Sequence, residues 1–151
     1  KFFPFGNGAE RMLKNQNIDS SIEGLNYNIH TSAHFARAVQ EGIAFAFTYG
    51  MEAFQDQDIN ISKIRAGHAN MFLSDLFAQT LSDLTNVKIE LYNTDGAIGA
   101  ARGALIGGDI LSPEEAFASL KVIKSFAPKH SKQYQTLYEE WKSILKTKLK
   151  N

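Results

Sequence analysis

An alternation of helical and extended hydrophobic patterns, running from residue 32 to residue 107, constrains the fold of this chain most. From Ser32 to Phe54, apolar side chains recur at spacings of three and four, which indicates one helix face. These side chains are Phe35, Val39, Ile43, Ala46, Phe47, Met51 and Phe54. A short strand is predicted next, over Ile59–Ala66, and a second helix from Ser74 to about Thr85.

The same alternation continues after residue 86. Val87 to Tyr92 is the clearest strand, because apolar and polar side chains alternate along it. The turn Asn93–Gly96 then leads into a helix of small residues, Ala97 to Gly107. Helices and strands that alternate in this way predict an α/β fold in which helices pack on a sheet.

Two further helices are predicted to close the chain. Ser112-Pro113-Glu114-Glu115 is a strong helix start, with a cap, a proline at the first helical position and acids in the first turn. The last helix runs from about Ser131 to Leu149 and becomes basic towards its end, which suits the helix macrodipole. Pro128 marks a linker between them, and an extended segment is expected earlier, over Ser21–Asn28. The length of 151 residues predicts a single domain over residues 1–151.

Charge and composition remove several classes of function. The 16 basic and 16 acidic residues balance, so nothing electrostatic favours a nucleic acid or an anionic membrane as partner. The absence of cysteine excludes disulfides and thiolate chemistry. No stretch approaches the roughly 20 apolar residues of a membrane span, and no signal peptide opens the chain, so a cytoplasmic protein is expected. The chain begins at Lys1 inside an apolar run, which indicates a piece of something longer.

The turn Gly67-His68-Ala69-Asn70 is the first place that could carry chemistry. Its glycine would let a ligand approach the main chain, and a following helix N-terminus offers N–H groups, so a phosphate site is one interpretation. An ordinary strand-to-helix turn is the other, and spacing alone favours it. Ser74 has the features of an N-cap, which would occupy one N–H group and weakens the phosphate interpretation. Neither GxxxxGK[ST] nor GxGxxG occurs in the sequence.

A stripe of glycines is the second place. Gly99, Gly103 and Gly107 lie four residues apart on the predicted helix, and each costs about 1 kcal/mol relative to alanine. Close approach of another backbone would compensate, so structural packing is the interpretation. Charged neighbours such as Arg102 exclude a membrane dimer.

Two further groups of residues complete the candidates. In the loop from Gly6 to Met12, Glu10 and Arg11 could hold a neighbouring segment or a ligand, or could simply be solvated. His30 and His34 are four residues apart, but HExxH is absent, no third ligand is visible, and His30 is expected to precede the helix. No metal site is therefore predicted.

Four blocks of the sequence, in this order, resemble the FGGY family of carbohydrate kinases. Phe5–Met12 is similar to the loop of its xylulokinases in which Gly-Glu-Arg follows an apolar-Pro stretch. His34–Phe45 resembles the family's long helix, and Ile64–Asn70 resembles its Gly-Gly-Gly-Ala nucleotide loop. Asp95–Ala101 resembles its acidic-x-Ala-x-Gly-Ala-Ala helix start, with Asp in place of the usual Glu. Tyr138–Trp141 resembles the closing helix.

The resemblance implies an actin-like ATPase, ribonuclease H-like fold, of which this chain would be the C-terminal part of the second, nucleotide-binding domain. The first domain, which binds most of the sugar, would be absent. By resemblance, the ATP-binding residues are Gly67, His68, Ala69 and Asn70, which would line the adenosine side of the site. His68 stands where the family usually has glycine.

The resemblance also implies an activity. The family uses ATP and Mg²⁺ to transfer the γ-phosphoryl group to a sugar hydroxyl, which works by positioning and charge stabilisation. D-xylulose is the expected sugar, and ATP or ADP the expected partner. The family's phosphate loops and catalytic Asp would lie upstream of Lys1, so no catalytic residue is assigned and the chain alone is expected to be inactive. A non-catalytic interaction module on the same scaffold is the alternative, with the last helix as its docking face.

A last expectation concerns self-association. If upstream strands are absent, a sheet edge or face is left open, and an open edge can pair with another chain. A homodimer is the simplest form of that association.

Overall fold

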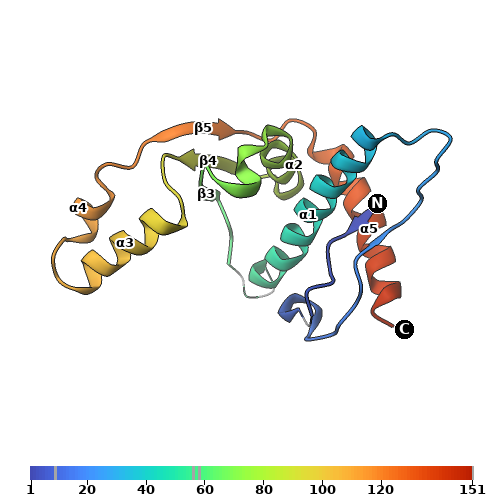
Figure 1. The fold of residues 1–151 in the computed structure, drawn as a ribbon, viewed down its shortest axis with the longest axis horizontal. Helices are drawn as coiled ribbons and strands as arrows, with labels where there is room; N and C mark the ends of the chain where they lie inside the picture. Colours follow the sequence, from blue (N-terminus) through green and yellow to red (C-terminus); the bar gives the residue numbers. More distant parts are fainter. Residues whose placement is uncertain (9, 56, 58, 151) are drawn as a thin grey trace.

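The computed structural model describes residues 1–8, 10–55, 57 and 59–150 of the chain, so Ala9, Asp56, Asp58 and Asn151 lie outside the description. Figure 1 shows α1, α2 and α5 grouped at one side and α3 with α4 at the other. In chain order, the elements are β1 (Phe2–Phe3), η1 (Arg11–Leu13), β2 (Ser21–Ile22), α1 (Ser32–Gln55), β3 (Lys63–Gly67), η2 (Asn70–Leu73), α2 (Asp75–Thr85), β4 (Lys88–Tyr92), α3 (Gly96–Gly107), α4 (Pro113–Phe117), β5 (Val122–Phe126) and α5 (Ser131–Lys148).

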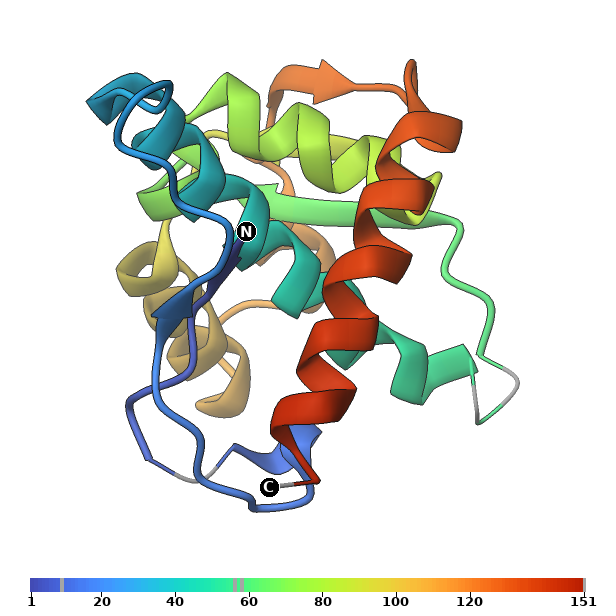
Figure 2. The same ribbon diagram turned by 90° about the vertical axis from the view of Figure 1, so that its right-hand side faces the viewer.

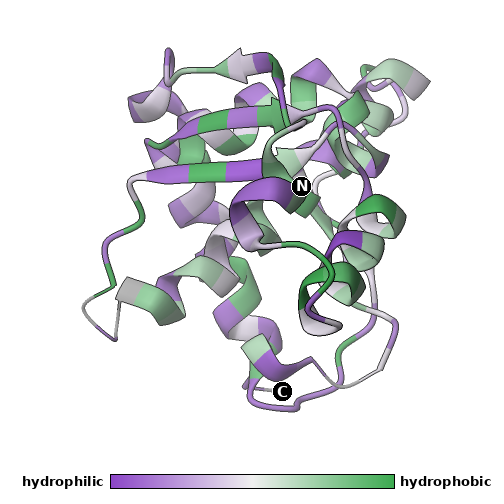
Figure 3. Cartoon of the chain, turned by 90° about the vertical axis from the view of Figure 1, so that its left-hand side faces the viewer, coloured by the Kyte–Doolittle hydropathy of each residue, from purple (hydrophilic) through white to green (hydrophobic). Residues whose placement is uncertain are grey.

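The main sheet has the strand order β3-β4-β5. β3 and β4 are parallel, in a register that places Lys63 opposite Lys88 and Gly67 opposite Tyr92, and α2 is the crossover between them. β5 adds to the other edge of β4 in the antiparallel direction. Figure 3 shows purple and green bands alternating along β3 and β4, as expected when one sheet face packs on helices. β1 and β2 form a separate antiparallel pair.

The hydrophobic core lies between one face of this sheet and the helices α1, α2 and α5. Ile89 and Leu91 of β4 are fully buried and pack with Phe77, Leu81 and Leu84 of α2 in one cluster. Figure 2 shows α5 standing across the strands beside α1 and α2. No helix among the described residues combines the length and the apolarity needed to cross a lipid bilayer.

Trp141 of α5 is the centre of this core and joins elements from both ends of the chain. Its ring is fully buried, stacks on Phe3 of β1 with centroids 5.2 Å apart, and lies 5.7 Å from the ring of Phe45 of α1. The indole N–H donates to the Phe2 carbonyl oxygen at 2.8 Å. A Cβ built on Gly42 of α1 would lie 2.3 Å from the same oxygen, so only glycine permits this packing of β1 on α1.

Helix boundaries agree closely with the sequence prediction, but burial on α1 does not follow its apolar stripe. Phe35, Phe47 and Phe54 are 45%, 50% and 49% exposed, whereas Phe45 and Thr48 are buried. The helix has apolar side chains on more than one side. The spacing of apolar residues indicates that α1 has an apolar face. Which side of the helix is buried depends on the elements that pack against it.

The strands are shorter than predicted, and one was missed. The segments expected over Ile59–Ala66 and Ser21–Asn28 form strands only at Lys63–Gly67 and Ser21–Ile22, respectively. The prediction that two helices follow one another at the end of the chain is wrong, because β5 lies between them. Its first four residues are exposed, and its strand conformation comes from pairing with β4, which no local pattern encodes.

The glycine stripe of α3 has no neighbour within the described part of the chain. A Cβ built on Gly99, Gly103 or Gly107 would meet nothing within 4 Å, and no residue of α3 is buried. The predicted close approach of another backbone is therefore wrong for this part of the chain, and the glycine face of α3 stays uncovered.

Glu90 of β4 is a buried charged residue, although the alternation of apolar and polar residues along this strand places it on the polar side. The residue is only 7% exposed, and Nζ atoms of Lys63 and Lys88 both lie 3.0 Å from its Oε1. Tyr92 donates its hydroxyl to Oε2 at 3.1 Å. Hydrogen bonds from Lys63 and then Lys88 lower the pKa of Glu90 from 4.5 to about 2. This carboxylate ties β3 and β4 together on the sheet face that the helices leave open.

We expect Glu90→Gln to change how the chain responds to acid. A carboxylate whose pKa is depressed by folding stabilises the fold above its unfolded pKa, near 4.5, and loses that contribution as the pH falls towards about 2. The free energy of unfolding in urea should therefore fall more steeply between these pH values for the natural chain than for the variant. Parallel acid profiles would contradict this.

Gly42 and Gly103 provide a matched pair for testing the packing of β1. Gly42→Ala should lower the free energy of unfolding by about 1–3 kcal/mol, because its methyl group would collide with the Phe2 carbonyl. Gly103→Ala, in open space inside a helix, should raise it by about 0.4–1 kcal/mol. Denaturation can be followed by the fluorescence of Trp141, the one tryptophan in the sequence. Equal effects of the two changes would refute the close contact.

Candidate functional site

Two turns meet at the carboxyl ends of the parallel strands β3 and β4. The first connects Gly67 to α2 by way of η2, and the second connects Tyr92 to α3. In sheets of this type, ligands bind in the crevice beyond the carboxyl ends of the strands. The predicted residues Gly67, His68, Ala69 and Asn70 all belong to the first turn.

A cavity of about 410 Å³ lies between the two turns and α1. Volumes of about 300–1,000 Å³ are usual for small-ligand sites. Gly67, Ala69 and Asn70 line the cavity, but His68 is not among the lining residues. The other lining residues are Phe47, Ala66, Met71, Phe72, Thr94, Asp95 and Gly96. Three of the four residues predicted in the first turn therefore line the cavity, while its other walls come from α1, β3, η2 and the second turn.

Main-chain hydrogen bonds hold the two turns together. The N–H groups of His68 and Thr94 both donate to the Tyr92 carbonyl oxygen, at 2.9 and 2.8 Å. The Ala69 N–H donates to the Gly67 carbonyl at 2.9 Å, and Asn70 adopts a left-handed conformation with a φ of 51°. Asparagine is one of the few residues that tolerate this region. Because His68 contributes through its main chain, its side chain is not needed for the shape of the turn.

Gly67 is required by the contact between the turns. A Cβ at this position would lie 2.4 Å from the Thr94 carbonyl oxygen. The sequence interpretation attributed this glycine to the approach of a ligand, whereas the structure places a second stretch of main chain there. The glycine thus shapes the cavity by letting its two walls come together.

Side-chain caps occupy the starts of both helices beside the cavity. Ser74 Oγ accepts from the Phe77 N–H at 3.3 Å, which confirms the predicted N-cap, and it donates to Gln40 Oε1 of α1 at 2.5 Å. Asp95 Oδ1 accepts from the Ile98 N–H at 2.9 Å. Capped amides are less available to an anion, and a carboxylate at the wall repels one. The cavity therefore suits an uncharged part of a ligand better than a phosphate.

Arg102 fixes the second turn, and the sequence analysis did not identify this role. Its Nη1 donates to Thr94 Oγ1 at 2.9 Å, and its Nη2 donates to Ser119 Oγ at 3.2 Å. Thr94 precedes Arg102 by eight residues in the sequence, and Ser119 follows it by seventeen. The only local signal was an arginine in a helix of small residues, which does not reveal a partner beyond the helix.

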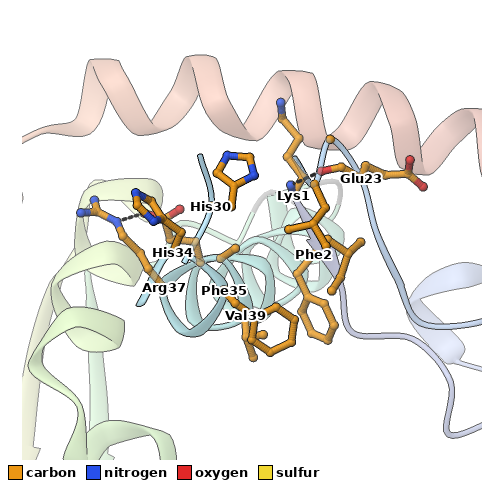
Figure 4. A pocket seen from close by; sticks show the side chains of 13 residues that line it. Lys1, Phe2, Glu23, His30, His34, Phe35, Arg37 and Val39 are labelled. Atoms are coloured by element: carbon orange, nitrogen blue, oxygen red, sulfur yellow. Dashed lines mark hydrogen bonds and ion pairs between the residues drawn. The ribbon is translucent and has the colours of Figure 1, made fainter. Parts of the chain in front are cut away.

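The other candidate residues lie away from this cavity. Glu10 lines a separate apolar groove beside α1, and Arg11 is exposed. His30 precedes α1 as expected, and its ring lies 5.7 Å from that of His34 in a pocket of about 210 Å³ shown in Figure 4. Their Nδ1 atoms accept main-chain N–H groups of Asn26 and Thr31. Across the described ranges, no three His, Asp or Glu side chains gather as a metal site would require.

Comparison with known proteins places this geometry in context. Residues 2–108 match the model of the C-terminal domain of the FGGY family of carbohydrate kinases. Over 138 residues, the chain is 31% identical to a xylulose kinase of Bacillus subtilis, covering 83% of this chain and 27% of the relative. A ribulokinase of Shouchella clausii is 29% identical over 151 residues, with 91% of this chain and 26% of the relative covered.

A solved structure extends the similarity to the fold. The crystal structure of Plasmodium falciparum glycerol kinase with ADP superposes with a TM-score of 0.77 at 25% identity. The match covers 98% of this chain and 30% of the glycerol kinase chain. The chain therefore spans between a quarter and a third of the length of these three proteins, and its predicted actin-like ATPase type of fold is confirmed.

We expect Gly67→Ala to disturb the cavity and Gly99→Ala to leave it intact. The new methyl group at position 67 would force the two turns apart, at a cost of about 1–3 kcal/mol in unfolding free energy. Amide chemical shifts of residues 67–70 and 94–96 should move together. A methyl group at position 99 meets open space and should leave the shifts of residues 67–70, on the other turn, unchanged. Unchanged shifts in both variants would argue against the contact between Gly67 and Thr94.

Proposed function

Because the chain belongs to the FGGY family of carbohydrate kinases, we propose that it forms one wall of the ATP site in a sugar kinase. The complete enzyme would transfer the γ-phosphoryl group of ATP to a sugar hydroxyl, with D-xylulose as its substrate. The observation that carries the proposal is the cavity between the turns that follow β3 and β4.

The chemistry of this cavity favours the nucleoside end of ATP. Its walls are mostly main chain and apolar side chains, one amide at the start of each neighbouring helix is capped, and Asp95 adds a negative charge. A base and a ribose suit such a surface, whereas a triphosphate needs cations and free amides. The glycerol kinase with a similar fold was solved with ADP, which supports a nucleotide as the ligand. The phosphates would then point out of the cavity, away from Asp95.

Charge stabilisation of the phosphoryl group is proposed to come from elsewhere in the enzyme. Phosphoryl transfer needs Mg²⁺ and a group that orients the attacking hydroxyl. The described residues hold no cluster of three potential metal ligands, so no Mg²⁺ site is assigned to them. No catalytic residue is assigned to this chain either, and we propose that the chain alone is inactive.

Uncovered apolar surfaces support a larger protein around this chain. In the sheet of the described residues, β3 is paired on one edge only, and the glycine stripe of α3 meets no neighbour. Met51 and Phe54 of α1 line an open apolar groove of about 390 Å³. We propose that other parts of the kinase cover these surfaces and complete the cleft. Self-association through the open edge remains a prediction for the chain on its own.

The proposed substrate can be tested on the complete gene product that contains this chain. A coupled assay of ADP formation across D-xylulose, L-xylulose, D-ribulose and glycerol should give the highest kcat/KM with D-xylulose. A strong preference for another sugar would remove the xylulose assignment and leave the kinase. Absence of ADP formation with every substrate would instead favour the non-catalytic interaction module.

A further inference from the structure

We propose that Phe47 and Phe72 form an aromatic platform that receives the purine base of the nucleotide. The inference rests on the proposed nucleotide site and assigns side chains that the family resemblance did not identify. Both phenyl groups line the cavity, yet they come from different elements, α1 and η2.

The fully buried ring of Phe77 holds the exposed ring of Phe47 and the half-buried ring of Phe72 in place. Phe77 of α2 is fully buried, and its ring meets Phe47 edge-on at 5.9 Å and Phe72 edge-on at 5.3 Å between centroids. The interplanar angles are 73° and 72°. Edge-on aromatic pairs at these distances are favourable and directional. Phe47 and Phe72 are therefore positioned by packing before any ligand arrives.

The lining of the cavity combines apolar and polar side chains, which suits the two parts of a nucleoside. The two phenyl groups and Met71 are its apolar members, while Asn70, Thr94 and Asp95 are its polar ones. A base can stack on aromatic rings, and ribose hydroxyls can donate to carboxylate or carbonyl oxygens. The base would therefore face Phe47 and Phe72, and the ribose would face Asp95.

Exposure of Phe47 also calls for a ligand or a partner. Half of its surface is accessible, and it is the only α1 residue that borders the cavity among the described residues; it also lines the apolar groove that contains Met51 and Phe54. A bound base would cover this apolar area, and aromatic stacking typically contributes a factor of about 5 to 100 in affinity per base. Because every base presents a π-face, the platform should favour bases in general over ligands that have none.

The test compares Phe47→Leu with Phe54→Leu in the complete gene product. Both phenylalanines lie on α1, line the same apolar groove and are about equally exposed, at 50% and 49%, but only Phe47 also borders the cavity. Phe47→Leu should weaken ADP binding, measured by calorimetry, by about 5-fold to 100-fold, and Phe54→Leu should leave it unchanged. Phe72→Leu is a second variant, expected to behave like Phe47→Leu. The affinity for inorganic pyrophosphate, which has no base, should be the same in all four proteins.

The outcomes separate this inference from the function on which it rests. If ADP binds with natural affinity to both cavity variants, the platform is overturned and the nucleotide site stands. If pyrophosphate binding falls as much as ADP binding, the rings act through the fold rather than through the base, and the platform is again overturned. If the natural protein does not bind ADP, the nucleotide site and the platform both fail.

Discussion

The packing of Trp141 against the Phe2 carbonyl and Gly42 is the contact on which the rest of the structure depends. It brings β1 and α5, from opposite ends of the sequence, onto the same turns of α1. Once α1 is held there, Gln40 can reach Ser74 and orient the start of α2. The cavity therefore depends on an aromatic core that contributes no residue to it. This is why changes far from a site can alter its geometry.

At the cavity itself, main-chain contacts do most of the shaping. Two turns share the Tyr92 carbonyl as acceptor, and the Thr94 carbonyl occupies the space in which Gly67 would otherwise carry a side chain. Such a site tolerates variation in the side chains of the turn, as long as the glycine and the hydrogen bonds remain. His68 fits this description, because its contribution to the hydrogen bonds of the turn comes from its N–H group.

Polar groups at the rim decide what kind of ligand the cavity suits. Ser74 and Asp95 cap the two neighbouring helices, so one amide of each is already engaged, and aromatic side chains line the same cavity as the Asp95 carboxylate. In the proposed kinase, the nucleoside and the phosphates of ATP would therefore be bound by different parts of the protein. This chain would receive the uncharged nucleoside, and the cations that phosphoryl transfer requires would come from another part of the protein. The uncovered faces of α1 and α3 are consistent with such a division.

The sequence by itself determined the α/β class, the helix positions, the caps at Ser74 and Ser112, and the family, because periodicity, capping and ordered motifs are local properties. It also located the turn at residues 67–70, three of whose four residues line the cavity. Only the tertiary structure decided the rest. It revealed β5, the ion-paired Glu90, the reason for Gly67, the role of Arg102, and which side of α1 is buried. Each of these depends on a partner far away in the sequence, and a local pattern does not say which partner the folded chain will supply.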